Sequence, residues 1–315
     1  MRPLMRAKQQ GVALITAILV LALAVIAATS ISSEHQLFMR RVENSVFGSN
    51  AWAYQYAAEN WAKTVLRRDL MASGPDDVDV FDHNEEDWAM PLTSMALPVG
   101  KISAQLRDEQ AKLNINNLLT DDGVDIVCKK RLQRIFSLLA VDPNIVDAII
   151  DWMDPDITPT LPYGAEDQYY NQLASPYLTA GQSIHDISEL RLIKGVTAED
   201  YAKLQPYLTA LPLRTNVNLN TASAHVLAAI VPDMSVSQAQ DFVRIRESEP
   251  YQHIQDFISQ VVLNNLQLDA EDLAVKSDFF TLSSEVQIEK SYLQQSSLMH
   301  RANTQVAVIK RLTGQ

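Results

Sequence analysis

The chain has 315 residues, of which 26 are Lys or Arg and 38 are Asp or Glu, so its formal charge is −12, and 47% of its residues are hydrophobic. This length suffices for about two domains with cores of their own, which excludes disorder along the whole chain. The acidic excess argues against a protein that wraps a nucleic acid, because such binding depends on Lys and Arg displacing counterions. The single cysteine, Cys128, excludes an intramolecular disulfide, and the six histidines show no metal-ligand spacing with it.

The N-terminus holds a short basic leader followed by a long apolar run. Three basic residues precede Gly11, and the next charged side chain is Glu34. A helix needs about 20 apolar residues to cross a hydrocarbon core of about 30 Å, so residues 12–33 are predicted to span a membrane once. By the positive-inside rule, the basic flank stays in the cytoplasm. The acidic remainder is then expected outside the cytoplasm, which is the periplasm in a cell that has one.

The junction between leader and apolar run resembles a class III, type IV prepilin-like leader. It consists of a short basic segment, then QQG, then VALIT. The resemblance implies that prepilin peptidase cuts between Gly11 and Val12 and leaves the apolar segment in the mature chain. A plain signal anchor is the alternative. A secretory signal peptide fits less well, because its apolar core has only about 7 to 15 residues.

Thr16 is the fifth residue after that cut, where most pilins and pseudopilins carry a glutamate. An acid there offsets the charged N-terminal amine of a neighbouring subunit, since an unpaired ion inside a membrane is costly. A subunit with no neighbour above it has nothing to neutralise. A neutral Thr16 therefore fits the top of a filament, and a chance substitution is the alternative.

The helix is predicted to continue through residues 34–72, which contain no proline and carry apolar residues at mostly helical spacing. The aromatic side chains in this stripe, including Trp52 and Tyr56, are expected in a core. The run from Asp69 to Trp88 that follows has eight acids and no Lys or Arg. Most such runs are solvated loops, and we expect one here.

Period-two alternation predicts antiparallel strands on both sides of a long insertion. Residues 97–118 alternate about a turn near Asp108 to Lys112, which suggests a β-hairpin. Alternation returns in residues 279–289, 291–302 and 304–312. We therefore expect one antiparallel sheet that is split by the insertion.

The insertion, residues 120–278, is predicted to be helical. Its segments 187–208 and 217–260 resemble helix-hairpin-helix units, many of which bind DNA through a Gly-x-Gly turn that faces a phosphate. The first turn here has only Gly195, and the second has no glycine and places Asp233 where the phosphate would sit. We interpret the two hairpins as packing or protein-docking units.

Residues 135–190 hold nine acids and no Lys or Arg, and five of these acids fall within the segment 151–171. Prolines and a glycine break that segment, so we predict a stiff loop that can turn several oxygens toward one hard cation, above all Ca²⁺. An acidic surface loop with helix-capping aspartates is the alternative. Repulsion between the acids favours the metal. Paired carboxylates also serve glycosidases, but no other catalytic motif accompanies them, and we expect no enzyme.

Together these features resemble the minor pseudopilin K family of type II secretion, also called general secretion pathway protein K. The leader, the neutral Thr16, the split sheet, the inserted hairpins and the motifs DWMDPD, YGAEDQYY and NLNTAS carry the resemblance over essentially the whole chain. The family implies an α+β pseudopilin fold, in which a long membrane-spanning helix packs on a small antiparallel sheet with a large inserted all-α domain. The expected divisions are a leader 1–11, a membrane span 12–33, a periplasmic helix 34–72, a split β domain 73–119 and 279–315, and an insertion 120–278.

The family also implies a place at the tip of the pseudopilus, in a complex with minor pseudopilins H, I and J that starts or caps assembly for protein export across the outer membrane. Secreted proteins and the outer-membrane channel are further expected contacts. The resemblance implies Ca²⁺ in the insertion, and the residues that match the motif are Asp154, Asp156, Glu166 and Asp167. The alternative from another class is a membrane-anchored periplasmic DNA receptor, which would need a basic, glycine-rich hairpin.

Overall fold

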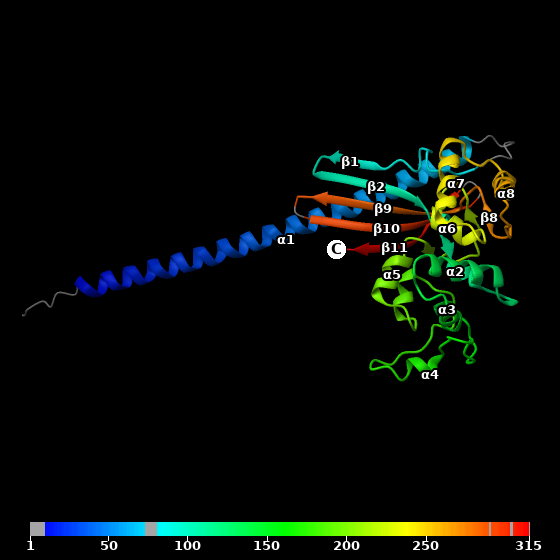
Figure 1. The fold of residues 1–315 in the computed structure, drawn as a ribbon. Coiled ribbons are helices and arrows are strands. Elements are labelled where there is room, and N and C mark those ends of the chain that lie inside the picture. Colours follow the sequence, from blue (N-terminus) through cyan, green and yellow to red (C-terminus); the bar gives the residue numbers. More distant parts are fainter. Residues whose placement is uncertain (1–9, 73–80, 290, 303–304, 315) are drawn as a thin grey trace, which may run out of the picture.

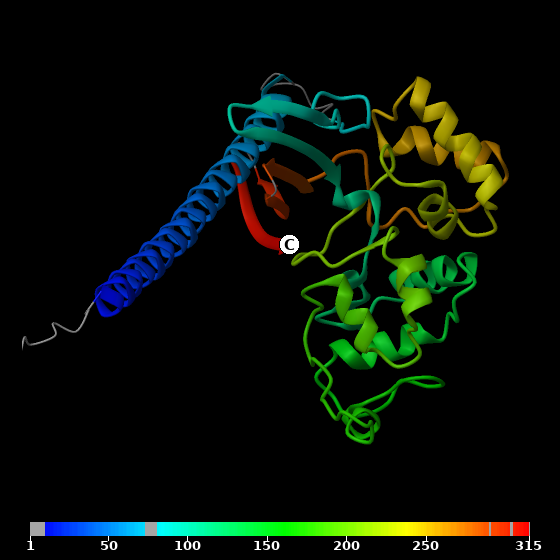
Figure 2. The same ribbon diagram turned by 90° about the vertical axis from the view of Figure 1, so that its left-hand side faces the viewer.

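The structure is a computed structural model, and it describes residues 10–72, 81–289, 291–302 and 305–314. One long helix carries a five-stranded sheet along its C-terminal half, and a mainly helical body lies beyond the sheet (Figures 1 and 2). Residues 1–9 of the expected leader lie outside the described part. The cleavage between Gly11 and Val12 therefore stays a prediction.

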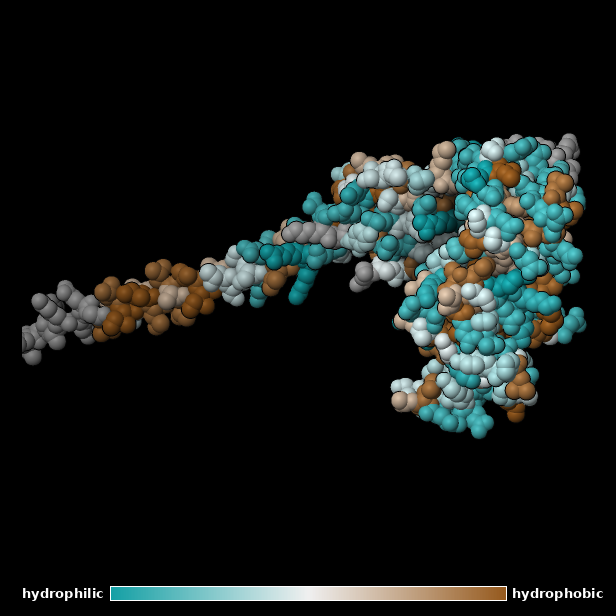
Figure 3. Space-filling view, in the orientation of Figure 1, coloured by the Kyte–Doolittle hydropathy of each residue, from teal (hydrophilic) through white to brown (hydrophobic). Residues whose placement is uncertain are grey.

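Helix α1 runs without a break from Gln10 to Ala72, as the lack of proline predicted. Its apolar part has a mean hydropathy of 2.8 in an 18-residue window, and none of that window is buried. Figure 3 shows this part as a brown stretch that projects away from the head. It is long and apolar enough to anchor the chain in a membrane by a single pass.

The C-terminal half of α1 packs on the sheet through small side chains, with Ala51, Ala58 and Ala62 all buried. The aromatic residues do not all join this core. Trp52 and Tyr56 are 51% and 60% exposed. The expectation of a buried aromatic stripe was wrong for these two, because the sheet covers only the helix face that carries the alanines.

The sheet has the strand order β1-β2-β9-β10-β11, and every neighbouring pair is antiparallel. Its strands are β1 (Leu92–Leu97), β2 (Gly100–Asp108), β9 (Phe279–Ile288), β10 (Ser291–Ala302) and β11 (Gln305–Gly314). The three C-terminal strands confirm the alternation in the sequence. The pairing of β2 with β9 confirms that one sheet is split by the chain between them.

The hairpin predicted near Asp108 to Lys112 was wrong. The hairpin joins β1 to β2 instead, with its turn at residues 98–99. After β2 the chain enters the short 3-10 helix η1 (Glu109–Ala111), because the Asp108 carboxylate accepts the Gln110 N–H at 2.7 Å and caps it. Alternation alone shows that a strand is present but does not show its partner.

A buried carboxylate fixes α1 on the sheet. Glu59 is 1% exposed and accepts hydrogen bonds from Gln295 and Ser297 at 2.8 Å each. Arg311 on β11 adds two contacts, at 2.7 and 2.8 Å. Burial alone would raise the pKa of Glu59, but the bonds from Arg311 and Ser297 hold it below its usual value.

The described end of the acidic segment, residues 81–88, is a loop, but it is only partly the solvated loop that we expected. Asp82 is fully buried, and Arg301 on β10 contacts it at 2.6 Å. The same guanidinium reaches Asp69 at the end of α1 at 2.8 Å. The expectation was wrong for Asp69 and Asp82, because a buried arginine on a distant strand pairs with these two acids. Residues 73–80 of the segment lie outside the described part.

Between β2 and β9 the chain forms two lobes (Figure 2). Their helices are η2 (Ile115–Leu118), α2 (Ile126–Leu138), α3 (Ile145–Met153), α4 (Asp167–Tyr170), η3 (Ile187–Leu192), α5 (Ala198–Leu204), α6 (Ala224–Ile230), α7 (Val236–Ser248) and α8 (Ile254–Leu263). The lobes meet through α2 and α6.

The insertion is mainly helical but not all-α as expected. Two-residue strands pair within it and with the segment just before it, as β3 (Leu113–Asn114) with β6 (Leu208–Thr209), β4 (Leu119–Thr120) with β5 (Gly123–Val124), and β7 (Val217–Asn218) with β8 (Leu273–Ala274). Extended linkers that run side by side satisfy their backbone groups in this way. Such short pairs leave no periodic signal in a sequence.

Candidate cation site in the acidic loop

The acidic loop, residues 151–167, runs from the last turn of α3 to the start of α4. Every residue of α3 is buried, so the helix gives the loop a fixed starting point. Asp154 ends that helix, and its N–H donates to the carbonyl of Ile150 at 2.9 Å. Glu166 occupies the N-cap position of α4. The loop and α4 lie at the end of the insertion that is far from the sheet (Figure 1).

Three of the four predicted ligands converge. One carboxylate oxygen each of Asp154, Asp156 and Glu166 lies within 4.8 Å of the other two. Glu166 is 5% exposed. Its Oε1 and Asp154 Oδ1 are buried and accept no hydrogen bond from any described residue. Burying a carboxylate oxygen without a donor is costly, so these two atoms indicate a site for a positively charged partner.

The electrostatics of the cluster agree with such a partner. Burial, together with the negative charges of Asp156 and Asp151, raises the pKa of Asp154 to about 6. Burial and the same group of acids raise the pKa of Glu166 to about 7. Oxygen donors of this kind are the ligands that Ca²⁺ takes in proteins. The residues present therefore fit a hard divalent cation.

Asp167, the fourth predicted ligand, is turned elsewhere. Its Oδ1 accepts the Thr179 N–H at 2.8 Å and the Thr179 hydroxyl at 2.9 Å, which ties the loop to the segment after α4. Asp151, which we did not predict as a ligand, is fully buried and accepts the Thr160 N–H at 2.9 Å. Asp151 thus holds the middle of the loop, and the place of Asp167 among the ligands stays a prediction.

Two further positions keep the loop closed. A Cβ atom on Gly164 would lie 2.2 Å from Asp151 Oδ2 and 2.4 Å from the Thr160 carbonyl oxygen, so only glycine fits there. Lys194 Nζ donates to the carbonyl oxygens of Tyr163 and Gly164 at 3.1 and 3.3 Å. From the sequence, we interpreted Gly164 only as a residue that interrupts regular structure and favours a loop. The role of Lys194 was missed, because the contact joins segments that are far apart along the chain.

The turn of the first predicted hairpin also contacts the acidic loop. The Lys194 N–H donates to the Tyr170 hydroxyl at 3.1 Å. Gly195 has a φ of +87°, and a Cβ there would lie 2.9 Å from the Tyr163 hydroxyl. In a DNA-binding hairpin this turn would face a phosphate. Here the Lys194 side chain faces the protein's own acidic loop.

A second group of acids already has a positively charged partner from the protein itself. Asp69, Asp82 and Glu86 also bring three carboxylate oxygens within 4.8 Å of one another. Arg301 contacts two of these acids and is itself 1% exposed. Because a guanidinium supplies the positive charge, this group is not a candidate cation site.

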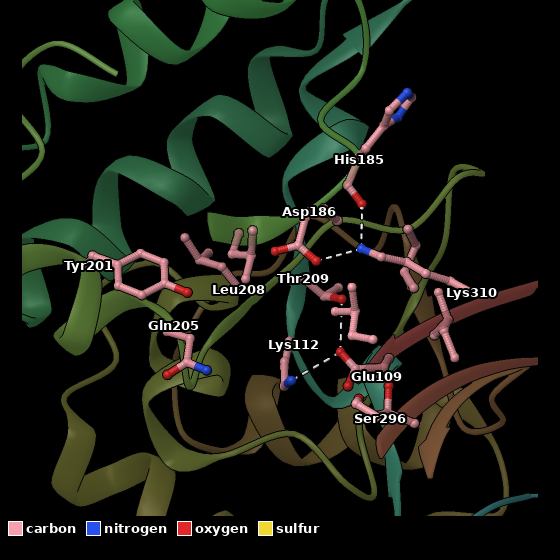
Figure 4. A pocket seen from close by; sticks show the side chains of 16 residues that line it. Glu109, Lys112, His185, Asp186, Tyr201, Gln205, Leu208, Thr209, Ser296 and Lys310 are labelled. Carbon is pink, nitrogen blue, oxygen red and sulfur yellow. Dashed lines mark hydrogen bonds and ion pairs between the residues drawn. The ribbon is translucent and has the colours of Figure 1, made fainter. Parts of the chain in front are cut away.

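A cavity of about 330 Å³ lies where the insertion meets the sheet (Figure 4). Four of its charged lining residues pair with one another. Lys310 on β11 pairs with Asp186, and Lys112 contacts Glu109 at 3.0 Å. Glu109 also accepts the Thr209 hydroxyl at 2.8 Å. The cavity thus lies at the contact between the sheet and the insertion. Each of these four charged side chains already has a partner of opposite charge.

Comparison with known proteins identifies similar chains. Two family profiles, both described as "Type II secretion system (T2SS), protein K", match residues 111–213 and 217–276, which correspond to the two lobes. The type II secretion system protein K of Pseudomonas aeruginosa is 33% identical over 99% of this chain and 95% of its own length. The protein of the same name from Aeromonas hydrophila is 31% identical over 98% of each chain.

A solved structure agrees in fold. A chain of the GspK-GspI-GspJ complex from the type 2 secretion system of enterotoxigenic Escherichia coli matches with a TM-score of 0.76 and 26% identity. The match covers 87% of this chain and 99% of that one. These similar proteins are secretion components, so the alternative of a DNA receptor gains no support from them.

Proposed function

The chain belongs to the type II secretion system protein K family and is a minor pseudopilin, and from this premise we propose that it caps the tip of the pseudopilus. The observation that carries the proposal is the position of the insertion. It lies beyond the end of the sheet that is remote from the apolar half of α1, and to one side (Figures 1 and 2). A subunit stacked above would meet the insertion, whereas α1 extends the other way and is free to bundle with subunits below.

Thr16 supports a place at the top of the filament. Its hydroxyl donates to the carbonyl oxygens of Val12 and Ala13 at 3.1 and 3.0 Å. The side chain is therefore satisfied within its own helix and needs no partner from a neighbour. A topmost helix has no subunit above it whose N-terminal amine it could neutralise.

The outer face of α1 offers a surface for the other subunits. Phe38, Val42, Trp52 and Tyr56 are all between 41% and 61% exposed. In the E. coli complex, GspK assembles with GspI and GspJ. We extend this to the present chain and propose that it forms a tip complex with minor pseudopilins H, I and J. The two helical hairpins of the insertion would serve as packing or docking units in that complex.

The N-terminal segment places this complex in the cell. We propose that prepilin peptidase removes residues 1–11 and that the apolar part of α1 remains in the inner membrane. The acidic head would then lie in the periplasm, where it supports export of proteins across the outer membrane. Secreted proteins and the outer-membrane channel are its further proposed contacts.

We propose that the acidic loop binds Ca²⁺ through Asp154, Asp156 and Glu166, with Asp167 as the fourth predicted ligand. The two buried carboxylate oxygens without donors support this most directly. Isothermal titration of the calcium-free full chain in detergent with Ca²⁺ tests it. Glu166→Gln should weaken binding at least tenfold, since it removes a buried charged ligand. A chain that takes up no Ca²⁺ would overturn the site.

An exchange of the membrane segment tests the cap. Replacing Val12 to Ser33 with an unrelated apolar span keeps the anchor but removes the surface that contacts neighbouring helices. Secretion and binding to the other minor pseudopilins should both be lost. If both survived the exchange, the chain would not be a filament cap.

A further inference from the structure

Lys194 lies in the turn between η3 and α5, yet its side chain belongs to the acidic loop. Its ammonium lies 3.1 Å from the Tyr163 carbonyl oxygen and 3.3 Å from that of Gly164. It also lies 4.3 Å from the ring centroid of Tyr163 and 5.2 Å from that of Tyr169. Two carbonyl dipoles and two aromatic faces thus surround one positive charge.

The base of this side chain is held firmly. The Lys194 N–H donates to the hydroxyl of Tyr170, which is fully buried. The Tyr170 ring packs edge-on against Trp152, with 5.5 Å between ring centroids. Ile193, the preceding residue, is 3% exposed. The backbone of Lys194 is therefore fixed, so only the rotamers of its side chain are ordered when its ammonium binds the loop.

The contacts of Lys194 complete a chain of bonds through the loop. Asp151 holds the Thr160 N–H, and the Thr160 carbonyl accepts the Gly164 N–H at 2.7 Å. Lys194 then holds the Gly164 carbonyl, two residues before Glu166. Repulsion among the acids would push this end of the loop away from Asp154. The ammonium opposes that movement from outside the carboxylate cluster.

We infer that Lys194 is a positioning residue for the cation site, which holds the Glu166 end of the acidic loop beside Asp154 and so prepares the site for a divalent cation. This inference rests on the proposed Ca²⁺ site. For the removal of the Lys194 ammonium, this inference predicts the opposite change in Ca²⁺ affinity from the one that charge repulsion alone predicts. A positive charge that merely lay nearby would repel Ca²⁺, and its removal would tighten binding. Removal of a positioning contact weakens Ca²⁺ binding, because the free-energy cost of ordering the loop is then subtracted from the binding free energy.

The experiment uses the full chain in detergent, freed of calcium with a chelator. Binding of Ca²⁺ alone is measured by calorimetry for the unchanged chain, Lys194→Met, Lys194→Arg and the control Lys203→Met. Lys203 pairs with Glu199 at 2.8 Å on α5, so the control removes the same charge from the same lobe. Hydrogen exchange of the amides from Thr160 to Asp167, without Ca²⁺, reports the order of the loop and does not depend on binding.

We expect Lys194→Met to weaken Ca²⁺ binding at least tenfold and to speed amide exchange in the loop. Lys194→Arg, which keeps charge and donors, should restore most of the affinity, and Lys203→Met should stay within about twofold of the unchanged chain. If Lys194→Met bound Ca²⁺ equally or more tightly, or left exchange unchanged, Lys194 would not position the site. If the unchanged chain bound no Ca²⁺, the proposed cation site itself would fail, and the role of Lys194 with it.

Discussion

Gly164 shows how tightly the acidic loop is built at the scale of single residues. Its missing side chain lets the Thr160 carbonyl and the Asp151 carboxylate approach the backbone. Gly164→Ala should therefore destabilise the head by about 1 to 3 kcal/mol, because neither neighbour is a flexible side-chain end in open space. Chemical denaturation of the full chain in detergent, followed by tryptophan fluorescence, measures this change.

Gly48→Ala is the matched control. A Cβ on Gly48 would meet nothing within 4 Å, and alanine favours a helix over glycine by up to about 1 kcal/mol. The control should thus lose no stability. If the two substitutions changed the free energy of unfolding equally, the backbone around Gly164 would not be crowded.

Glu86 makes the stability of the head depend on pH. Burial and the negative charge of Asp69 raise its pKa to about 7, although hydrogen bonds from Trp88 and His83 act in the opposite direction. A carboxyl whose pKa is raised on folding binds its proton more tightly in the folded state. Its contribution to stability is therefore lost as the pH rises from about 4.5 to about 7.

Glu86→Gln keeps the acceptor oxygen and removes the charge. The variant should be more stable than the unchanged chain by about 1 kcal/mol at about pH 8, and its stability should change less with pH. Unfolding curves recorded across this range test the effect. A variant that is less stable at about pH 8, with the same pH slope, would show that Glu86 is not a source of the pH dependence.

The residues of the site differ in how far the sequence could predict them. Asp154, Asp156 and Glu166 lie close together in the chain between prolines, so a loop that gathers them follows from local pattern. Asp167 belongs to the same motif, but Thr179 holds its carboxylate. Lys194 could not be predicted, because its contact depends on how η3 and α5 fold back on the loop.

At the scale of elements, Arg301 joins β10 to the last turns of α1 and to the acidic segment that follows. It is 1% exposed and pairs with Asp69 and with the fully buried Asp82. Arg301→Met should cost about 3 to 5 kcal/mol, because it leaves the buried Asp82 carboxylate without its positively charged partner. Denaturation of the full chain in detergent measures the loss.

The control for this variant is Arg68→Met. Arg68 pairs with Asp87 at 3.1 Å, but both side chains are mostly exposed, at 67% and 75%. Exposed pairs contribute at most about 1 kcal/mol. If both variants lost a similar free energy of unfolding, the buried pair of Arg301 and Asp82 would contribute no more to stability than an exposed pair.

Elements with a strong hydrophobic periodicity in the sequence were predicted well. The strands or helices against which they pack were not all predicted. Alternation placed β9, β10 and β11, and the unbroken apolar pattern placed α1. The hairpin partner of β2 was misplaced, because alternation is the same whichever neighbour pairs with it. Trp52 was expected in the core for a similar reason, since helical spacing does not show how wide the covering sheet is.

At the scale of the whole molecule, the shape separates a part that can join a filament from a part that stops one. The insertion lies beyond the sheet, at the end remote from the apolar half of α1 (Figure 1). In the proposed cap, the exposed face of α1 contacts other helices, and the insertion blocks a following subunit. Composition alone could not show this arrangement. It depends on where β2 leaves the sheet and β9 returns to it, which is at the end remote from the membrane span.

The cap is tested most directly by native mass spectrometry of the tip complex. Cells produce this chain together with minor pseudopilins H, I and J and prepilin peptidase, and the complex is purified from them. A cap occurs once, so we expect a single copy of this chain in each complex, with a mature N-terminus at Val12. A chain that still begins at Met1, or a complex that contains this chain in several stacked copies, would contradict the proposed place at the tip.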